Sequence, residues 1–138
     1  MRGGDYACAI FWREQKILLG KRSPHRRAYP NVWDILGGKK EEGESLEQAL
    51  TREMREEIGV TPRNVTKLTV LRDPMESLHD PMRYHIYRVD AWDGGEPALL
   101  NHEHTELRWF SIADACAQPD LALPEYRNLF KKLVIAHT

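Results

Sequence analysis

The chain has 138 residues, which at about 150 residues per domain predicts a single domain over residues 1–138. Hydrophobic residues make up 41% of the sequence and charged residues 30%, a balance typical of a globular protein and not of a disordered one. The 20 Lys and Arg side chains nearly cancel the 21 Asp and Glu side chains, so the net charge of -1 argues against nucleic acid or an anionic membrane as a partner.

Hydrophobic periodicity and turn residues predict the elements in chain order. Strands are expected at residues 5–12, 16–22, 65–72, 82–92 and 106–110, with a loop at 23–31, a short apolar segment at 32–36, and a second loop marked by Asp73-Pro74 and Asp80-Pro81. Helices are expected at 45–58, 112–117 and 124–136, and Ser45 and Gly59 would cap the two ends of the first. This order predicts an α/β fold, a mixed sheet flanked by helices.

Membrane and secreted proteins do not fit the sequence. No apolar run approaches the roughly 18 residues that a membrane-spanning helix needs, and the N-terminal residues lack the apolar segment of a signal peptide. Cys8 and Cys116 are too few for a disulfide framework, and neither belongs to a CxxC pair. We therefore expect a cytoplasmic protein with two reduced thiols.

The helix at 45–58 carries an unusual set of carboxylates. At about 100° per residue, its apolar positions form one stripe, and Glu53 and Glu57 fall inside that sector with Glu56 at its edge. Like charges at these spacings repel, and carboxylates beside a core lose hydration. Mg2+ would remove both problems, because it binds carboxylate oxygens together with waters and substrate phosphates. The helix therefore predicts a metal site for a phosphorylated substrate; the alternative is a solvated face with ordinary salt bridges.

The net charge hides two adjacent blocks of opposite sign. Residues 16–40 hold seven basic side chains and one acid, and residues 41–60 hold seven glutamates and two arginines. A cationic strand and loop beside an anionic helix could hold a phosphate chain bridged by metal. The alternative for each basic residue is a solvated loop position, and His25-Arg26-Arg27 could contact a terminal phosphate or only solvent.

A spaced motif runs through both blocks. It has the form G-x5-E-x7-R-E-U-x-E-E-x-G-U, in which U is a bulky aliphatic residue. Its fixed positions are Gly38, Glu44, Arg52, Glu53, Glu56, Glu57 and Gly59, with Met54 and Val60 at the two U positions. This pattern resembles the signature of the Nudix hydrolase family, and the sequence is most similar to MutT-like nucleotide pyrophosphohydrolases. The resemblance implies the α/β/α sandwich of that family.

The resemblance also implies an activity, the Mg2+-dependent hydrolysis of a nucleoside diphosphate linked to another moiety. The favoured substrate is a nucleoside triphosphate, cleaved to monophosphate and pyrophosphate, with oxidised purines such as 8-oxo-dGTP as one candidate and Mn2+ as a substitute metal. ADP-ribose or another ADP-linked compound is an alternative, although Pro74 is only a near miss to the proline that marks ADP-ribose enzymes. A non-catalytic nucleotide-binding regulator is a further alternative. The partner would be a small nucleotide, and the chain a monomer or homodimer.

Metal and catalytic roles follow from the same resemblance. Glu53, Glu56 and Glu57 would bind Mg2+, joined by the carbonyl of Gly37 or Gly38 and by Glu103 from a loop before a late strand. Glu53 or Glu103 would be the catalytic base, and Arg52 would orient Glu53. Glu44 would tie the loop to the helix, and Gly38 and Gly59 would have structural roles.

Substrate-binding roles are assigned to four further residues. Lys39 and Arg22 match positions at which basic side chains meet phosphate. Trp33 and Asp34 could contact the base, since aromatic faces stack on bases, although Trp33 could equally belong to the core. His102 and His104 flank Glu103 and could bind metal or face solvent.

Overall fold

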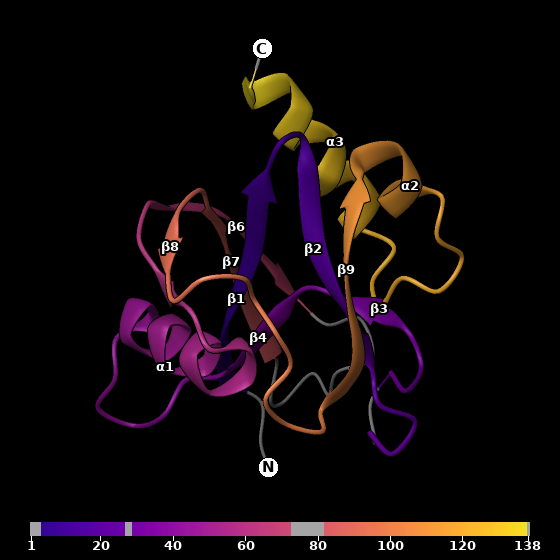
Figure 1. The fold of residues 1–138 in the computed structure, drawn as a ribbon. Helices are drawn as coiled ribbons and strands as arrows, with labels where there is room; N and C mark the ends of the chain where they lie inside the picture. Colours follow the sequence, from indigo (N-terminus) through magenta and orange to yellow (C-terminus); the bar gives the residue numbers. More distant parts are fainter. Residues whose placement is uncertain (1–3, 27–28, 73–81, 138) are drawn as a thin grey trace.

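The computed structural model describes residues 4–26, 29–72 and 82–137 (Figure 1). Its strands are β1 (Gly4–Arg13), β2 (Lys16–Arg22), β3 (Trp33–Asp34), β4 (Leu36–Lys39), β5 (Thr61–Pro62), β6 (Val65–Arg72), β7 (Met82–Val89), β8 (Trp92–Asp93) and β9 (His104–Ser111). Its helices are α1 (Leu46–Ile58), α2 (Ile112–Cys116) and α3 (Tyr126–His137). None of the helices in these ranges is long and apolar enough to cross a membrane.

Within the described residues, seven strands form one mixed sheet. Its main path is β3-β2-β1-β7-β6, and β4 and β9 pair with β1 and β2. The β1–β7 pair is parallel and the others are antiparallel. Strand β1 changes partner along one edge: Trp12 and Arg13 pair with β2, whereas residues 6–9 pair with β4. Strands β1 and β2 therefore diverge, and the short strand β4 lies where they separate.

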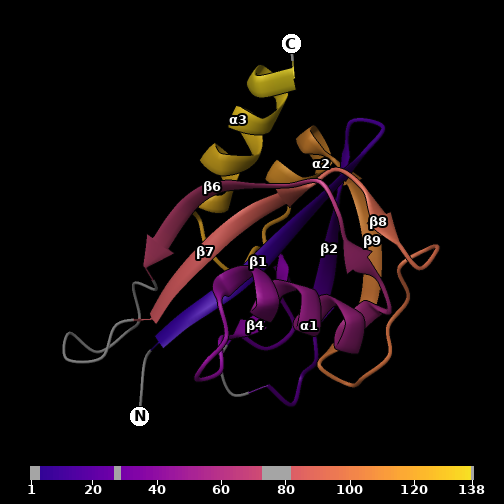
Figure 2. The same cartoon turned by 90° about the vertical axis from the view of Figure 1, so that its left-hand side faces the viewer.

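The two faces of the sheet bury separate apolar clusters. Cys8, Ile10 and Trp12 of β1 face the cluster that includes α3, and the alternate residues Ala7 and Ala9 face the cluster that includes α1. Figures 1 and 2 show α1 across one face and α3 over the other. The predicted α/β architecture, a mixed sheet flanked by helices, is confirmed.

Several predicted boundaries differ from the structure. The strand expected at 82–92 ends at Val89, and Trp92 pairs instead with Pro62 in a small ribbon of β5 and β8. The strand expected at 106–110 runs from His104 to Ser111, because its whole length pairs with β2. The helix expected from 124 begins at Tyr126. The loop with Asp73-Pro74 and Asp80-Pro81, and also Arg27, lie outside the described residues.

Candidate active site

Helix α1 has the ends that the sequence predicts. Ser45 Oγ accepts a hydrogen bond from the Gln48 amide at 3.0 Å, and the Gln48 side chain accepts one from the Ser45 amide at 2.8 Å. Gly59 ends the helix in the left-handed conformation, with φ of 73°, which glycine adopts without steric cost. Because both ends are fixed, the angular position of every carboxylate on α1 is fixed as well.

The glycine pair forms part of strand β4, where the carboxylate of Glu53 packs against it. A Cβ atom at position 38 would lie 2.1 to 2.4 Å from the Glu53 carboxylate atoms, so a side chain there would displace that carboxylate. A Cβ atom at position 37 would lie 2.3 Å from the Ala7 carbonyl oxygen of β1. Gly37 therefore allows the close approach of β4 to β1, and Gly38 leaves room for the Glu53 carboxylate against β4.

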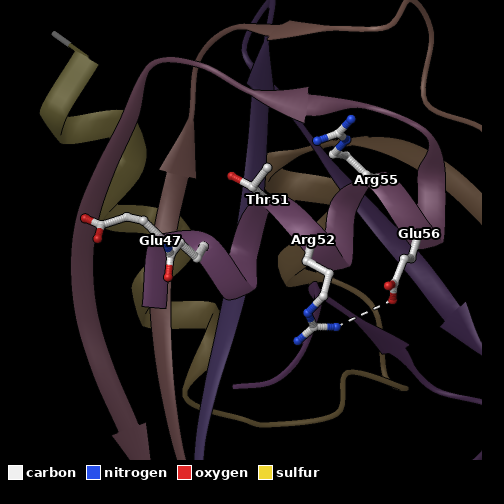
Figure 3. Close-up of a pocket in the computed structure, with 6 residues that line it drawn as sticks. Glu47, Thr51, Arg52, Arg55 and Glu56 are labelled. Carbon is white, nitrogen blue, oxygen red and sulfur yellow. Dashed lines mark hydrogen bonds and ion pairs between the residues drawn. The ribbon is translucent and has the colours of Figure 1, made fainter. Parts of the chain in front are cut away.

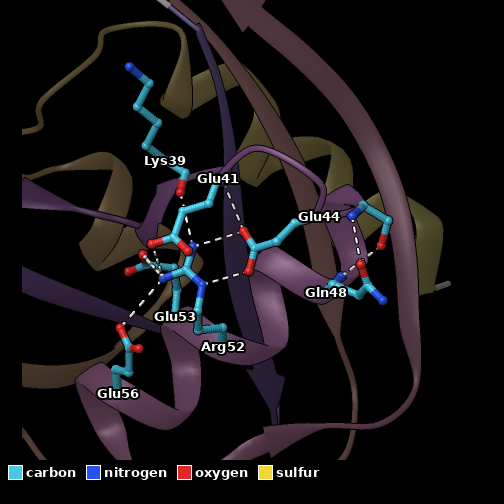
Figure 4. Close-up of polar contacts among 8 residues, drawn as sticks. Lys39, Glu41, Glu44, Gln48, Arg52, Glu53 and Glu56 are labelled. Atoms are coloured by element: carbon cyan, nitrogen blue, oxygen red, sulfur yellow. Dashed lines mark hydrogen bonds and ion pairs between the residues drawn. The ribbon is translucent and has the colours of Figure 1, made fainter.

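Arg52 connects Glu53 to the loop that precedes the helix (Figure 4). Its Nε and Nη2 donate to the two carboxylate oxygens of Glu44 at 2.7 and 3.1 Å, and Nη2 also donates to the Lys39 carbonyl oxygen at 3.1 Å. Its Nη1 donates to Glu53 Oε2 at 2.8 Å and lies 3.5 Å from Glu56 Oε1. The guanidinium thus holds Glu53 in one orientation.

Glu44 completes this arrangement on the loop side. One of its oxygens also accepts from the Glu41 amide at 2.9 Å. The Arg52 guanidinium, followed by that amide, lowers the pKa of Glu44 to about 2, so this carboxylate is ionised at neutral pH. Glu44 is therefore a fixed charge that connects the loop to the helix, at the place where the motif expects a supporting acid.

Glu57 has the opposite surroundings. Its side chain is 1% exposed, and neither carboxylate oxygen has a hydrogen-bond partner among the described residues. Burial, followed by the neighbouring Glu53 carboxyl, raises the pKa of Glu57 to about 10. Glu56, in contrast, has a side chain that is 61% exposed. The helical geometry thus places the three carboxylates as the periodicity predicts.

The donor set of this cluster fits a hard divalent cation. The buried Glu57 carboxylate has no donor among the described residues and lies beside the Glu53 carboxylate, so it needs either a proton or a cation, and oxygen ligands suit Mg2+. In the described ranges, no three acidic, histidine or cysteine side chains already converge as a closed metal cage. Mg2+ does not require one, because it usually takes one or two carboxylates together with waters and substrate phosphates.

A cavity of about 340 Å³ opens beside Glu53. Its lining residues include Gly37, Gly38, Lys39, Glu53 and Glu103. Of the basic residues between 16 and 40, three of those that the structure describes line the cavity: Arg22, Arg26 and Lys39. Arg26 Nη1 donates to Glu103 Oε1 at 3.2 Å. The structure therefore brings basic and acidic side chains from distant segments to one cavity.

Asp34 is also part of the cavity wall. Asp34 Oδ1 accepts from the Tyr126 hydroxyl at 2.7 Å and from the Ile35 amide at 2.8 Å, and Arg22 Nη1 lies 3.4 Å from Oδ2. Burial raises the pKa of Asp34 despite these contacts. Trp33 does not line the cavity: it packs edge-on against Phe110 in the core, with ring centroids 5.0 Å apart. The structure thus favours the core alternative for Trp33.

Other aromatic and imidazole groups in the cavity wall were not assigned from the sequence. Tyr6, Tyr84 and Tyr126 all line it, and Tyr126 meets Asp34 from 92 positions away, so local sequence carried no signal for that contact. His104 also lines the cavity and is buried, with no partner for Nδ1 within the described residues. Burial lowers the pKa of His104 to about 4, so the ring is neutral near pH 7. His102 is exposed.

The outward side of α1 forms a second depression, of about 580 Å³ (Figure 3). Its lining residues are Glu47, Gln48, Thr51, Arg52, Arg55 and Glu56. All six belong to α1, and one helix face cannot enclose a ligand. The cavity beside Glu53 draws its walls from several elements, and we take it as the candidate active site for that reason.

Comparison with known proteins assigns the class. The sequence profile of the NUDIX domain matches residues 2–133, and the chain therefore belongs to the Nudix family. The crystal structure of a MutT NUDIX hydrolase from Burkholderia pseudomallei has the same fold, with a TM-score of 0.79 and 27% identity over 94% of this chain and 96% of that one.

Two curated relatives define the type of reaction more narrowly. The chain is 30% identical to nucleoside triphosphatase NudI of Escherichia fergusonii, over 96% of this chain and 98% of the relative. It is 34% identical to CTP pyrophosphohydrolase of Escherichia coli, over 83% and 81% of the two chains. With the family, these relatives identify the protein as a hydrolase that acts on a phosphoric anhydride.

Proposed function

We propose that this hydrolase cleaves a nucleoside triphosphate to the monophosphate and pyrophosphate with Mg2+, for which Mn2+ can substitute. The proposal depends most on Glu57, whose buried carboxylate has no donor among the described residues and lies beside Glu53. A divalent cation would supply the missing positive charge, and a triphosphate chain would supply further oxygen ligands. We also propose that residues 1–138 form one domain, because both apolar clusters pack on a single sheet.

The proposed metal ligands are the acids of the helix and its neighbours. Glu53, Glu56, Glu57 and the carbonyl of Gly37 or Gly38 would bind Mg2+, with Glu103 as a further ligand. When bound, Mg2+ would supply positive charge that stabilises the charge developing on the phosphate oxygens.

The catalytic base would be Glu53, with Glu103 as the alternative. Arg52 already holds one oxygen of Glu53 at 2.8 Å, which supports the orienting role proposed for this arginine. A carboxylate held in this way can accept a proton from an attacking water without first reorganising.

The remaining cavity residues would bind the nucleotide. Lys39 and Arg22 line the cavity and would contact the phosphates, and Asp34 would contact the base together with the Tyr126 hydroxyl. A buried acid–tyrosine pair can both donate and accept hydrogen bonds, as a group that reads the edge of a base requires.

A substrate panel with product identification tests the proposal. The purified protein is incubated with Mg2+ and, separately, with CTP, the other common nucleoside triphosphates, 8-oxo-dGTP and ADP-ribose, and a parallel series contains EDTA. We expect a nucleoside triphosphate to yield monophosphate and pyrophosphate only with metal. Preferential cleavage of ADP-ribose would favour the ADP-linked alternative, and nucleotide binding without any hydrolysis would favour a regulator.

A further inference from the structure

An ion pair lies at the cavity, between the segment after β2 and the segment before β9. Arg26 Nη1 and Glu103 Oε1 are 3.2 Å apart, and the two side chains are 34% and 45% exposed. Both residues line the cavity that also contains Glu53. The pair therefore combines a cation of the basic block with the acid proposed as a further metal ligand.

The backbone positions both members of this pair. The Ser23 amide donates to the Glu103 carbonyl oxygen at 2.9 Å, and the Arg26 amide donates to the Ser23 carbonyl oxygen at 3.2 Å. Ser23 is itself buried. On the other segment, the Glu103 amide donates to Asn101 Oδ1 at 3.1 Å. The backbone hydrogen bond between Ser23 and Glu103 thus joins the two segments, and this places the Arg26 and Glu103 side chains next to each other.

Arg26 differs from the two other arginines near the cavity. Arg52 makes paired contacts with Glu44 and further contacts with Glu53 and the Lys39 carbonyl. Arg22 contacts the Tyr29 carbonyl oxygen at 3.0 Å and Asp34. The contact that the structure shows for the Arg26 side chain joins one N–H to one oxygen, and exposed pairs of this kind contribute little to stability. Arg26 is therefore suited to exchange its partner.

The charge of Arg26 acts on more than Glu103. Arg26 lines the same cavity as Glu53, the carboxylate next to Glu57 on α1. It is therefore placed to contribute positive charge beside the acidic cluster. A guanidinium carries five N–H donors in a planar fork that also fits phosphate oxygens.

We propose that Arg26 is a tethered counter-ion that pairs with Glu103 until substrate enters, and then releases Glu103 to the metal and itself binds the phosphate chain. The inference rests on the proposed function, since it requires a metal and a phosphorylated substrate at this cavity. Arg26 would act on the metal through Glu103 and is in that respect a positioning residue. It should compete with metal alone and assist binding of metal together with phosphate.

Arg26→Gln tests the exchange through two effects of opposite sign. By calorimetry with Mg2+ alone, the variant should bind the metal about two- to fivefold more tightly than the unmodified protein, because a competing cation is absent. With inorganic triphosphate and saturating Mg2+, it should bind the anion about tenfold more weakly, because a charged hydrogen bond is lost. The matched control is Arg63→Gln, which removes an exposed arginine paired with Asp93 and should change neither affinity.

A double-mutant cycle identifies the partner of Arg26. In a Glu103→Gln background, Arg26→Gln should no longer tighten Mg2+ binding, since the pair is already broken. Unchanged or weaker Mg2+ binding by Arg26→Gln alone would overturn the exchange, as would equal tightening in both backgrounds. These outcomes are separate from the proposed function: a protein that cleaves no phosphoric anhydride would contradict that function whatever the metal affinities are.

Discussion

The carboxylates around Arg52 and the carboxylate of Glu57 have opposite surroundings. Around Arg52, Glu44 and Glu53 accept charged hydrogen bonds of 2.7 and 2.8 Å, and the pKa of Glu44 falls to about 2. Four residues beyond Glu53, Glu57 is buried without a donor among the described residues, and its pKa rises to about 10. In the first region every carboxylate has hydrogen-bond partners, and these contacts fix the orientation of Glu53. In the second region Glu57 lacks, within the described residues, the partners that would stabilise a negative charge.

The difference indicates a division of roles within one motif. Buried polar groups in folded proteins nearly always have partners, so an exception of this kind points to a bound ion or to a function. The saturated region, formed by Glu44, Arg52 and Glu53, can hold Glu53 in place. In the unsatisfied region, which is the buried Glu57 carboxyl, an ionised carboxylate would be destabilised by burial, and a bound cation would remove that destabilisation. The following predictions change one region at a time.

The largest effect is expected for Glu53, which belongs to the saturated region and lies beside Glu57. Glu53→Gln should reduce turnover by about 10²–10⁴-fold, because the amide cannot accept a proton as a carboxylate does. Turnover and the melting temperature are measured on the same preparation, with Glu47→Gln on the outer face of α1 as the control. Near-normal turnover in Glu53→Gln would place the base elsewhere, with Glu103 as the next candidate.

Loss of the saturated region should have a smaller effect. Glu44→Gln breaks the paired contact with Arg52, so Glu53 loses its fixed orientation, and turnover should fall about 10- to 100-fold. Steady-state kinetics of Glu44→Gln and of the control Glu42→Gln, an exposed neighbour in the same loop, measure this change. Equal activity of the two variants would show that the Arg52 contacts do not orient the catalytic group.

A substitution in the unsatisfied region should stabilise the metal-free protein. Without metal, Glu57→Leu should raise the free energy of unfolding by about 1–2 kcal/mol, because an unpartnered buried acid is replaced by an apolar side chain. Denaturant unfolding measures the difference, and Glu56→Leu, at an exposed position of the same helix, should stay within about 0.5 kcal/mol of the original protein. A destabilised Glu57→Leu variant would show that Glu57 has partners in the metal-free protein.

The last prediction, the smallest when taken per pH unit, is a pH dependence of stability. The pKa of Glu57 is raised from 4.5 to about 10 in the folded protein, so its contribution to stability is fully present below pH 4.5 and is lost as pH rises toward 10. For one proton, the free energy of unfolding without metal changes by at most about 1.4 kcal/mol per pH unit. Metal binding displaces that proton, so the stabilisation by Mg2+ should increase with pH. Unfolding curves at several pH values measure both trends, and a Glu57→Gln variant with the same slopes would contradict this assignment.

The parts of the site that local sequence determines could be predicted. The positions of Glu53, Glu56 and Glu57 follow from the helical repeat, and the ends of α1 follow from Ser45 and Gly59. The glycine pair was not predicted to be a strand, because glycine is disfavoured in strands. It pairs with β1 nevertheless, and the Glu53 carboxylate of α1 occupies the space that a side chain at position 38 would take.

Contacts between distant segments could not be predicted in the same way. Asp34 and Tyr126 lie 92 positions apart, and Arg26 and Glu103 lie 77 apart. Their meeting depends on the path of the whole chain around the sheet, for which no local periodicity carries a signal. Trp33 illustrates the same limit, since its aromatic ring suited both a base and the core until the packing against Phe110 was known.

The most direct test of the metal site is a calorimetric titration of the purified protein with Mg2+, alone and with nucleotide. The carboxylate cluster predicts saturable binding that Glu57→Gln weakens by about tenfold or more while the fold is retained. Absence of saturable binding in both titrations, or a Glu57→Gln variant that binds Mg2+ as tightly as the unmodified protein, would contradict the metal site.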